Sequence, residues 1–194
     1  MNELMPLFLK LAGRRVLLVG GGPVALEKAE LLLRAGARVE VVALEVLPAF
    51  RELAVAIAER AFVPADVHGA WFVVAAATPE VNRAVRRACD AQARFVVAVD
   101  DLESATAFGA ARVERGGVTF AISTGGHAPA LVRLLREALE SVLPRELDGW
   151  LELARAERVR WKEARVPFGE RRHLLFRALE KMYGARDSRA AEAL

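Results

Sequence analysis

Three consecutive glycines at positions 20–22 directly follow a short apolar run, Val-Leu-Leu-Val, at positions 16–19. An uninterrupted apolar run of this length predicts a strand that is buried on both faces of a parallel sheet. Pro23 suits a first helical position, and the Ala- and Leu-rich stretch that continues to about Ala35 predicts a helix. A strand, a glycine-rich turn and a helix in this order favour an α/β fold with a parallel sheet.

The glycine turn fits the pattern G-x-G-x-x-A, with Gly20, Gly22 and Ala25 at the defined positions and Gly21 between them. Glycine permits the sharp turn and lets the backbone approach a pyrophosphate, while the small third residue lets the helix pack closely on the strand. The N–H groups and the positive end of the helix would then face the phosphates. We therefore expect the turn to bind a dinucleotide.

The same alternation continues along the chain. We expect further strands over residues 39–42, 71–75 and 95–99, and helices over residues 48–60 and 79–91. Strands that alternate with helices at this spacing predict a doubly wound, Rossmann-type parallel sheet.

The pattern changes after Asp101. Residues 106–111 and 117–122 flank a Gly-Gly connection, which predicts a hairpin, and residues 129–142 predict an amphipathic helix. Beyond Pro144 we expect only helices, separated at Gly149, residues 167–169 and Gly184. The predicted organisation is a dinucleotide-binding domain over 1–110, a smaller α+β dimerisation and substrate-binding region over 111–145, and a helical C-terminal region over 146–194.

Charge and composition restrict the partners. The net charge is +3, and residues 144–194 alone hold 12 Lys and Arg against 9 Asp and Glu. This excess suits an acidic partner or a solvated helix surface, and we expect no nucleic-acid partner. The single cysteine, Cys89, excludes an internal disulfide, and no apolar run reaches the ~20 residues of a membrane span. The N-terminus lacks the regions of a signal peptide, so we expect a cytoplasmic protein without a membrane partner.

The end of the second predicted strand bears on cofactor choice. An acidic residue that would hold a ribose hydroxyl belongs about 20 residues after the turn. That position is Ala43, and Leu44 and Glu45 follow it. Glu45 could reach the ribose from a slightly longer loop, or backbone contacts could replace it. Because no Lys or Arg stands there to bind a 2′-phosphate, the sequence favours NAD over NADP.

Asp100 and Asp101 follow the apolar strand at 95–99. Ligands of open α/β sheets bind beyond the carboxyl ends of the strands, so at least one carboxylate should face the cofactor cleft. It could accept a proton as hydride leaves for the nicotinamide. The alternative is an aspartate that caps backbone amides of its own loop.

Three separated segments resemble the siroheme synthase dehydrogenase/ferrochelatase family, in the same order as in that family. The first, residues 11–37, runs from LAGRRVLLVGGGPVA to LLLRAGA, and the second, residues 99–103, reads VDDLE. The most specific is ISTGGHAPAL at residues 122–131, followed by Arg133 and LLRE. Leu102 replaces a proline that is common in the family, and Ala128 replaces a serine.

The resemblance implies oxidation of precorrin-2, a tetrapyrrole, to sirohydrochlorin with NAD in siroheme biosynthesis, and in some members insertion of ferrous iron. It assigns the catalytic aspartate to Asp100 and the NAD contacts to Pro23, Val24, Leu44 and Glu45, beside the glycine turn. Larger family members append a methyltransferase domain that makes precorrin-2, for which we expect no room in this chain.

The residue types of the third segment also predict a function independently of the family resemblance. Gly125 and Gly126, just before a helix, permit an anion-binding nest, and nearby Arg133 would help to hold a polycarboxylate. A capped loop is the alternative. The predicted substrate-binding residues are Ser123, Thr124, Gly125, Gly126, His127 and Arg133. His127 could serve metal delivery or only hydrogen-bond its loop, and we expect no resident metal.

The helical C-terminal region contains Trp150, Trp161 and Phe168, more apolar surface than so small a region can bury. This predicts a homodimer built largely by residues 110–194. The sequence also allows two other functions: a non-catalytic NAD-sensing module, and an NAD-dependent oxidoreductase that acts on another polyacid.

Overall fold

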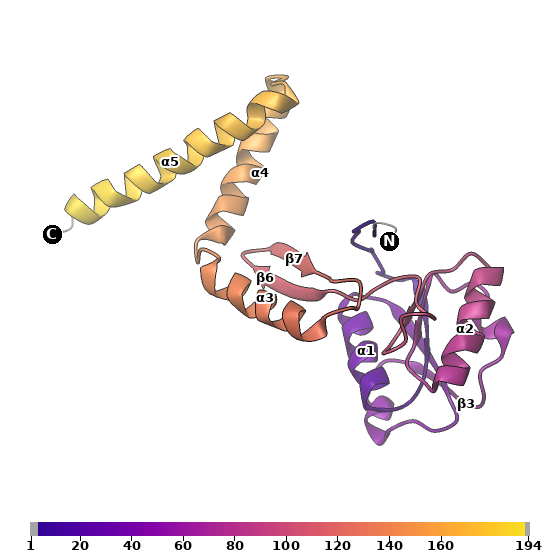
Figure 1. Cartoon of the computed structure of the whole chain (residues 1–194). Coiled ribbons are helices and arrows are strands. Elements are labelled where there is room, and N and C mark those ends of the chain that lie inside the picture. Colours follow the sequence, from indigo (N-terminus) through magenta and orange to yellow (C-terminus); the bar gives the residue numbers. More distant parts are fainter. Residues whose placement is uncertain (1–3, 193–194) are drawn as a thin grey trace. The chain divides into compact units, whose positions relative to one another are not determined.

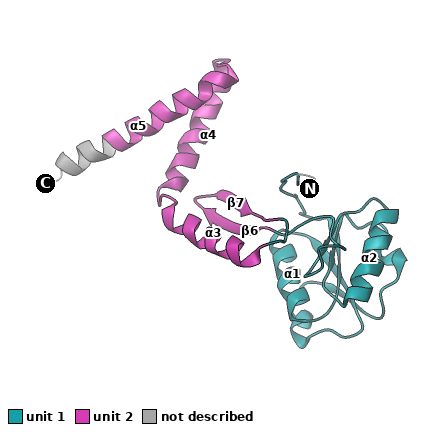
Figure 2. Ribbon diagram, viewed as in Figure 1, with its two compact units in different colours: residues 1–109, 125–127 teal, residues 110–124, 128–194 magenta. Residues whose placement is uncertain are grey.

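The computed structural model describes residues 4–192, and the side chains of residues 4–184. The chain forms two compact units (Figure 2). Unit 1 comprises residues 1–109 and 125–127, and unit 2 comprises residues 110–124 and 128–194.

Unit 1 is built on a five-stranded parallel sheet with the order β3-β2-β1-β4-β5. The strands are β1 (Arg15–Val19), β2 (Arg38–Ala43), β3 (Ala56–Glu59), β4 (Phe72–Ala75) and β5 (Val96–Ala98). The central strand β1 pairs with β2 on one side and β4 on the other. Its apolar side chains are fully or almost fully buried, which explains the uninterrupted apolar run.

Helices cover both faces of this sheet (Figure 1). On one face, α1 (Pro23–Arg34) packs Ala25, Ala29 and Leu32 against β1, β2 and β4. On the other face, α2 (Pro79–Ala91) packs Val85 and Cys89 against β1, β4 and β5. The predicted doubly wound α/β fold is therefore confirmed, and the strand order reverses beside β1, where such sheets bind their ligands.

The predicted helix over residues 48–60 is wrong. A short 3-10 helix, η1 (Pro48–Glu52), is followed by extended backbone at Leu53 and by β3. Residues 56–59 pair with β2 from Glu40 to Ala43, and Phe50 is completely buried. Pairing with the sheet thus overrides the helical preference of this alanine-rich stretch. A second 3-10 helix, η2 (Pro64–Val67), leads toward β4.

Unit 2 starts with an antiparallel hairpin of β6 (Ala111–Arg115) and β7 (Val118–Ile122), turned by Gly116 and Gly117. The hairpin was predicted, but its first strand begins at Ala111, because Thr106 instead hydrogen-bonds the edge of β5 through Val96. The next helix, α3 (Pro129–Val142), is as predicted.

Two long helices complete unit 2: α4 (Leu147–Glu163) and α5 (Phe168–Glu192). The predicted interruptions at Gly149 and Gly184 are wrong, because both residues lie inside helices, whereas residues 164–167 do separate α4 from α5. The indole N–H of Trp150 donates a hydrogen bond of 2.7 Å to the hydroxyl of Tyr183, which holds the two helices together. None of the helices within residues 4–192 is both long and apolar enough to cross a membrane.

Candidate functional site

The glycine turn is fixed by close backbone contacts on two sides. Gly20 has a φ of +129°, and a Cβ added there would overlap the backbone oxygen of Ala76, just beyond β4. A Cβ on Gly21 would overlap the backbone oxygen of Glu45, beyond β2. The N–H of Leu47 also donates to the oxygen of Gly21 at 3.0 Å. Only glycine fits at these two positions, because backbone atoms that cannot move aside occupy the space of a side chain.

Gly22 differs from its two neighbours, because a Cβ added there would meet no atom within 4 Å. It is the N-cap of α1, has no side chain with which to cap the helix, and accepts the first helical hydrogen bond from Leu26. The first N–H groups of a helix lack intrahelical acceptors, and the helix dipole makes this end positive. The open space at Gly22 therefore suits a phosphate group, and the turn fits the pyrophosphate of a dinucleotide.

The loop after β2 forms one side of this position. Leu44 is 74% exposed and Glu45 is also exposed, so both can meet a ligand. The first cation that follows in the sequence, Arg51, is bound at 2.6 Å to Glu59. The loop thus offers an exposed carboxylate and no unpaired cation, as the sequence suggested.

The loop after β4 depends on a residue that sequence reasoning missed. Asn82 on α2 is 2% exposed, and its side-chain oxygen accepts a 3.2 Å hydrogen bond from the N–H of Ala77. This bond orients the backbone that lies against Gly20. The sequence signal that could have found it is its position on the apolar stripe of the helix, three residues before Val85 and seven before Cys89.

The two aspartates after β5 have different environments. The side-chain oxygen of Asp101 accepts a 3.1 Å hydrogen bond from the N–H of buried Ser104, so it caps its own loop. Asp100 is exposed, has a φ of +54°, and makes no hydrogen bond or ion pair within the described part of the chain. A non-glycine residue in the left-handed region is uncommon, although aspartate tolerates it. Asp100 is therefore the carboxylate that is available for chemistry.

Gly125 and Gly126 belong with His127 to unit 1, although the residues before and after these three belong to unit 2. Both have positive φ, +64° and +84°. A Cβ on Gly126 would overlap the side chain of Leu102, two residues after Asp100. The leucine that departs from the family's proline is thus the side chain that supports this turn, which the sequence did not indicate.

The remaining predicted substrate residues are divided between the two units. His127 is exposed in unit 1. In unit 2, the Thr124 hydroxyl accepts a 3.0 Å hydrogen bond from the N–H of Ala128, just before α3, and Ser123 is exposed. Arg133 is exposed on α3 and pairs with Glu137 at 3.2 Å. Among the side chains of residues 4–184, no three His, Cys, Asp or Glu gather as metal ligands.

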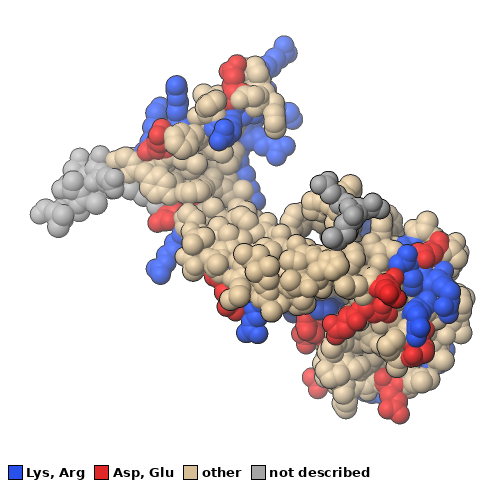
Figure 3. Space-filling model, in the orientation of Figure 1, with Lys and Arg blue, Asp and Glu red and all other residues tan. Residues whose placement is uncertain are grey.

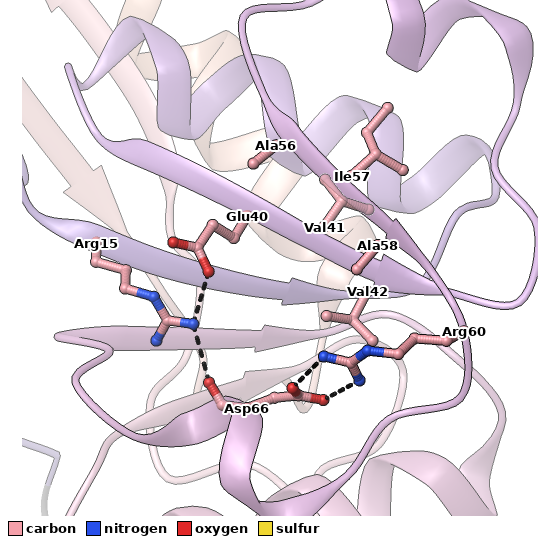
Figure 4. A pocket seen from close by; sticks show the side chains of 9 residues that line it. All are labelled: Arg15, Glu40, Val41, Val42, Ala56, Ile57, Ala58, Arg60 and Asp66. Carbon is pink, nitrogen blue, oxygen red and sulfur yellow. Dashed lines mark hydrogen bonds and ion pairs between the residues drawn. The ribbon is translucent and has the colours of Figure 1, made fainter.

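Unit 1 has a hollow beside β2 and β3 (Figure 4). Its charged groups are paired with one another. Arg15 binds Glu40 at 2.7 Å and the backbone oxygen of Asp66 at 3.1 Å, and Arg60 binds the Asp66 carboxylate at 2.6 and 2.9 Å. These bonds tie the loop after β3 to the sheet. The hollow is lined by Arg15, Glu40, Val41, Val42, Ala56, Ile57, Ala58, Arg60 and Asp66.

The sequence and structure of the chain match known proteins over most of its length. A family model described as "Putative NAD(P)-binding" matches residues 7–110. "Siroheme synthase 2" of Aeromonas salmonicida is 44% identical over 180 residues, and "Siroheme synthase" of Citrobacter koseri is 39% identical over 173 residues. The alignments cover 91% and 87% of this chain but only 37% and 38% of those relatives.

Among solved structures, "SirC, precorrin-2 dehydrogenase" superimposes with a TM-score of 0.71 and 26% sequence identity. That match covers 90% of this chain and 88% of the other. The resemblance to the siroheme synthase family that the three sequence segments indicated is confirmed.

Proposed function

Since the chain belongs to the NAD(P)-binding family whose model matches residues 7–110, we propose that it oxidises precorrin-2 to sirohydrochlorin with NAD. The similarity to siroheme synthases and to a precorrin-2 dehydrogenase supports this substrate. Because the chain spans only 37% of the length of the Aeromonas relative, the activity is our proposal for this chain.

One structural observation carries the proposal. The open position at Gly22 and the unpartnered carboxylate of Asp100 both lie just beyond the carboxyl ends of strands of the same sheet. That edge is where open α/β sheets bind ligands. Gly20, Gly21 and Gly22 would bind the pyrophosphate, together with Pro23 and Val24, and Leu44 and Glu45 would bind the adjacent ribose. The exposed Glu45 and the absence of an unpaired cation in residues 43–51 favour NAD over NADP.

NAD would supply the hydride acceptor of the reaction. Oxidation of the tetrapyrrole removes a hydride and a proton, and the proton needs a base. Asp100 is exposed and engaged by no other group in the described residues, whereas the Asp101 carboxylate already accepts a backbone N–H. Asp100 therefore accepts the proton, which is general base catalysis.

The polycarboxylate substrate needs groups that bind anions. The Gly125–Gly126 turn, with positive φ at both residues, remains the predicted anion-binding nest for these carboxylates. Ser123, Thr124, His127 and Arg133 remain predicted substrate contacts. Insertion of ferrous iron, which would be a second substrate, remains a prediction from the family resemblance alone.

A homodimer is the expected assembly. Helix α3 has no buried residue, and Leu131, Leu134, Leu135 and Val142 are 44–73% exposed. In Figure 3 the surface over α3 and the hairpin is mostly uncharged, whereas Lys and Arg project from α4 and α5. An apolar stripe on a helix that is otherwise polar is typical of an interface, and a two-fold pairing of unit 2 would cover it.

The direct test presents purified protein with precorrin-2 and NAD and follows reduced nicotinamide and sirohydrochlorin together. We expect both to form in equal amounts. An NAD-sensing module would bind NAD without turnover, and an oxidoreductase for another polyacid would leave precorrin-2 unchanged. Either result would contradict the proposal.

A further inference from the structure

The segment before β1 exposes an unusual amount of apolar surface. Among residues 4–9, five large apolar side chains are exposed by 49–78% of their area, and Phe8 by 71%. None of residues 4–10 takes part in a hydrogen bond with another described residue. Contiguous apolar surface of this kind marks a place where a ligand or partner binds. The five side chains are those of Leu4, Met5, Leu7, Phe8 and Leu9.

This segment lies next to the proposed substrate turn. Within unit 1, the side chain of Leu4 lies 3.2 Å from the place that a Cβ on Gly125 would occupy. The next residue, Gly126, rests on Leu102, which follows Asp100 by two positions. A chain of direct contacts thus connects the apolar segment to the loop that holds the candidate base.

We propose that residues 4–9, named here the N-terminal wall, form the apolar side of the substrate site and pack against the face of the tetrapyrrole macrocycle. A tetrapyrrole combines an apolar ring face with carboxylates at its rim. The N-terminal wall matches the ring face, and the adjoining Gly125–Gly126 turn matches the carboxylates. The inference rests on the proposed function, since it concerns the same substrate.

A small amphipathic ligand suits the N-terminal wall better than a strand of another chain. A strand would have to pair with the free backbone of residues 4–10, but Pro6, in the middle of the segment, has no N–H to donate. Packing of side chains against a flat ring makes no such demand on the backbone.

Phe8 offers the sharpest test, and Phe95 offers a matched control. Both are exposed phenylalanines of unit 1, at 71% and 60%. Phe95 precedes β5, so it lies at the amino end of that strand, opposite to Asp100. Since both rings are mostly exposed, neither Phe8→Gln nor Phe95→Gln should change the melting temperature much.

With precorrin-2 as substrate, Phe8→Gln should raise KM about tenfold or more, because burial of an aromatic ring on the substrate is lost. The kcat and the affinity for NAD should stay near those of the unchanged protein, since the ring touches neither the reacting atoms nor the cofactor. Phe95→Gln should leave all three quantities unchanged. Equal KM values for the two variants would refute the proposal that the N-terminal wall contacts the substrate.

A binding measurement separates this inference from the proposed activity. Uroporphyrin, a polycarboxylate tetrapyrrole that cannot be turned over, should bind the protein and slow hydrogen exchange of residues 4–10, whereas NAD alone should not. Phe8→Gln should weaken this binding as it raises KM. If the unchanged protein fails to oxidise precorrin-2 but shows this Phe8-dependent binding, the proposed function is wrong. The contact between the N-terminal wall and a tetrapyrrole is then still supported. If turnover is normal and residues 4–10 exchange equally fast with uroporphyrin, the wall is refuted.

The same variants also test whether a second copy of the chain, and not the substrate, covers residues 4–9. Sedimentation of Phe8→Gln should give the same mass as the unchanged protein. A smaller mass, with unchanged KM, would show that a second copy of the chain covers residues 4–9, and would overturn the proposal.

Discussion

Gly21 lies so close to Glu45 that a Cβ on the glycine would overlap the backbone oxygen of the glutamate. The glycine turn and the loop after β2 are therefore one rigid piece, joined further by the bond from the N–H of Leu47 to the oxygen of Gly21. The elements that would bind the pyrophosphate and the ribose are thereby fixed before any ligand arrives, which lowers the entropic cost of binding.

The three glycines should respond differently to substitution. Gly22→Val should weaken NAD binding about tenfold or more by calorimetry, because its side chain would fill the space open to the pyrophosphate. The melting temperature should change little. Gly21→Ala is the contrasting variant, because its methyl group meets backbone, and it should destabilise the fold by about 1–3 kcal/mol. A Gly22→Val protein that binds NAD normally would exclude this turn as the cofactor site.

Cofactor preference follows from the loop after β2. We expect NAD to bind at least several-fold more tightly than NADP, since the exposed Glu45 would repel a 2′-phosphate. Calorimetric titration with each dinucleotide measures this directly. Glu45→Ala should narrow the difference, and an equal affinity of the unchanged protein for both cofactors would contradict the assignment.

The paired charges beside β2 and β3 predict an acid-sensitive part of the stability. The Arg60 guanidinium, hydrogen-bonded to Asp66, holds the pKa of that carboxyl below its usual value of 3.8. A carboxylate with a lowered pKa stabilises the fold above the unfolded-state pKa, and this contribution is lost as pH falls through the folded-state value. Asp66→Asn should therefore lower the free energy of unfolding at neutral pH.

Urea unfolding across pH provides the measurement. The difference between Asp66→Asn and the unchanged protein should shrink once the pH falls below about 3.8. Glu27→Gln is a suitable comparison, because that carboxylate is exposed on α1 and forms a surface ion pair with Lys28 at 2.9 Å. A difference that is the same at all pH values would show that the charge of Asp66 contributes nothing.

The apolar stripe on α3 predicts the assembly. Leu134 is 64% exposed in the single chain, and Leu134→Glu should shift a homodimer toward the monomer by burying a charge at the interface. Val63→Glu, which changes an exposed apolar residue of unit 1, should leave the mass unchanged. Sedimentation at micromolar concentration decides, and a monomeric unchanged protein would contradict the prediction.

The regular parts of the fold could be predicted because local pattern and tertiary structure agree there. Residues 79–91 and 129–142 begin with proline at a first helical position and keep a helical apolar pattern, and both helices have the predicted bounds. Residues 56–59 were mispredicted because a four-residue edge strand leaves little periodic signal. Its conformation depends on pairing with β2, which the local sequence does not reveal.

The candidate site was predictable only in part, because some of its contacts join residues that are far apart in the sequence. The glycine turn and the two aspartates follow from position alone, since the carboxyl ends of parallel strands meet at one edge. The support of Gly126 by Leu102 and the packing of Leu4 beside Gly125 join residues more than 20 and 100 positions apart. No local pattern encodes such contacts, so only the structure could show them.

Asp100 and Asp101 are neighbours in sequence but differ in what binds their carboxylates. Asp100 is unengaged in the described part of the chain, whereas Asp101 caps its loop through Ser104. Reduced nicotinamide is followed with precorrin-2 and NAD for Asp100→Ala, Asp101→Ala and the unchanged protein. Asp100→Ala should lower kcat roughly 100-fold or more, the usual contribution of general acid–base catalysis, with NAD affinity unchanged.

Asp101→Ala should cost much less turnover and should mainly lower the melting temperature, because only a loop cap is lost. If the two variants behave in reverse, Asp101 is the base. Full turnover by Asp100→Ala would show that this exposed carboxylate does not accept the proton.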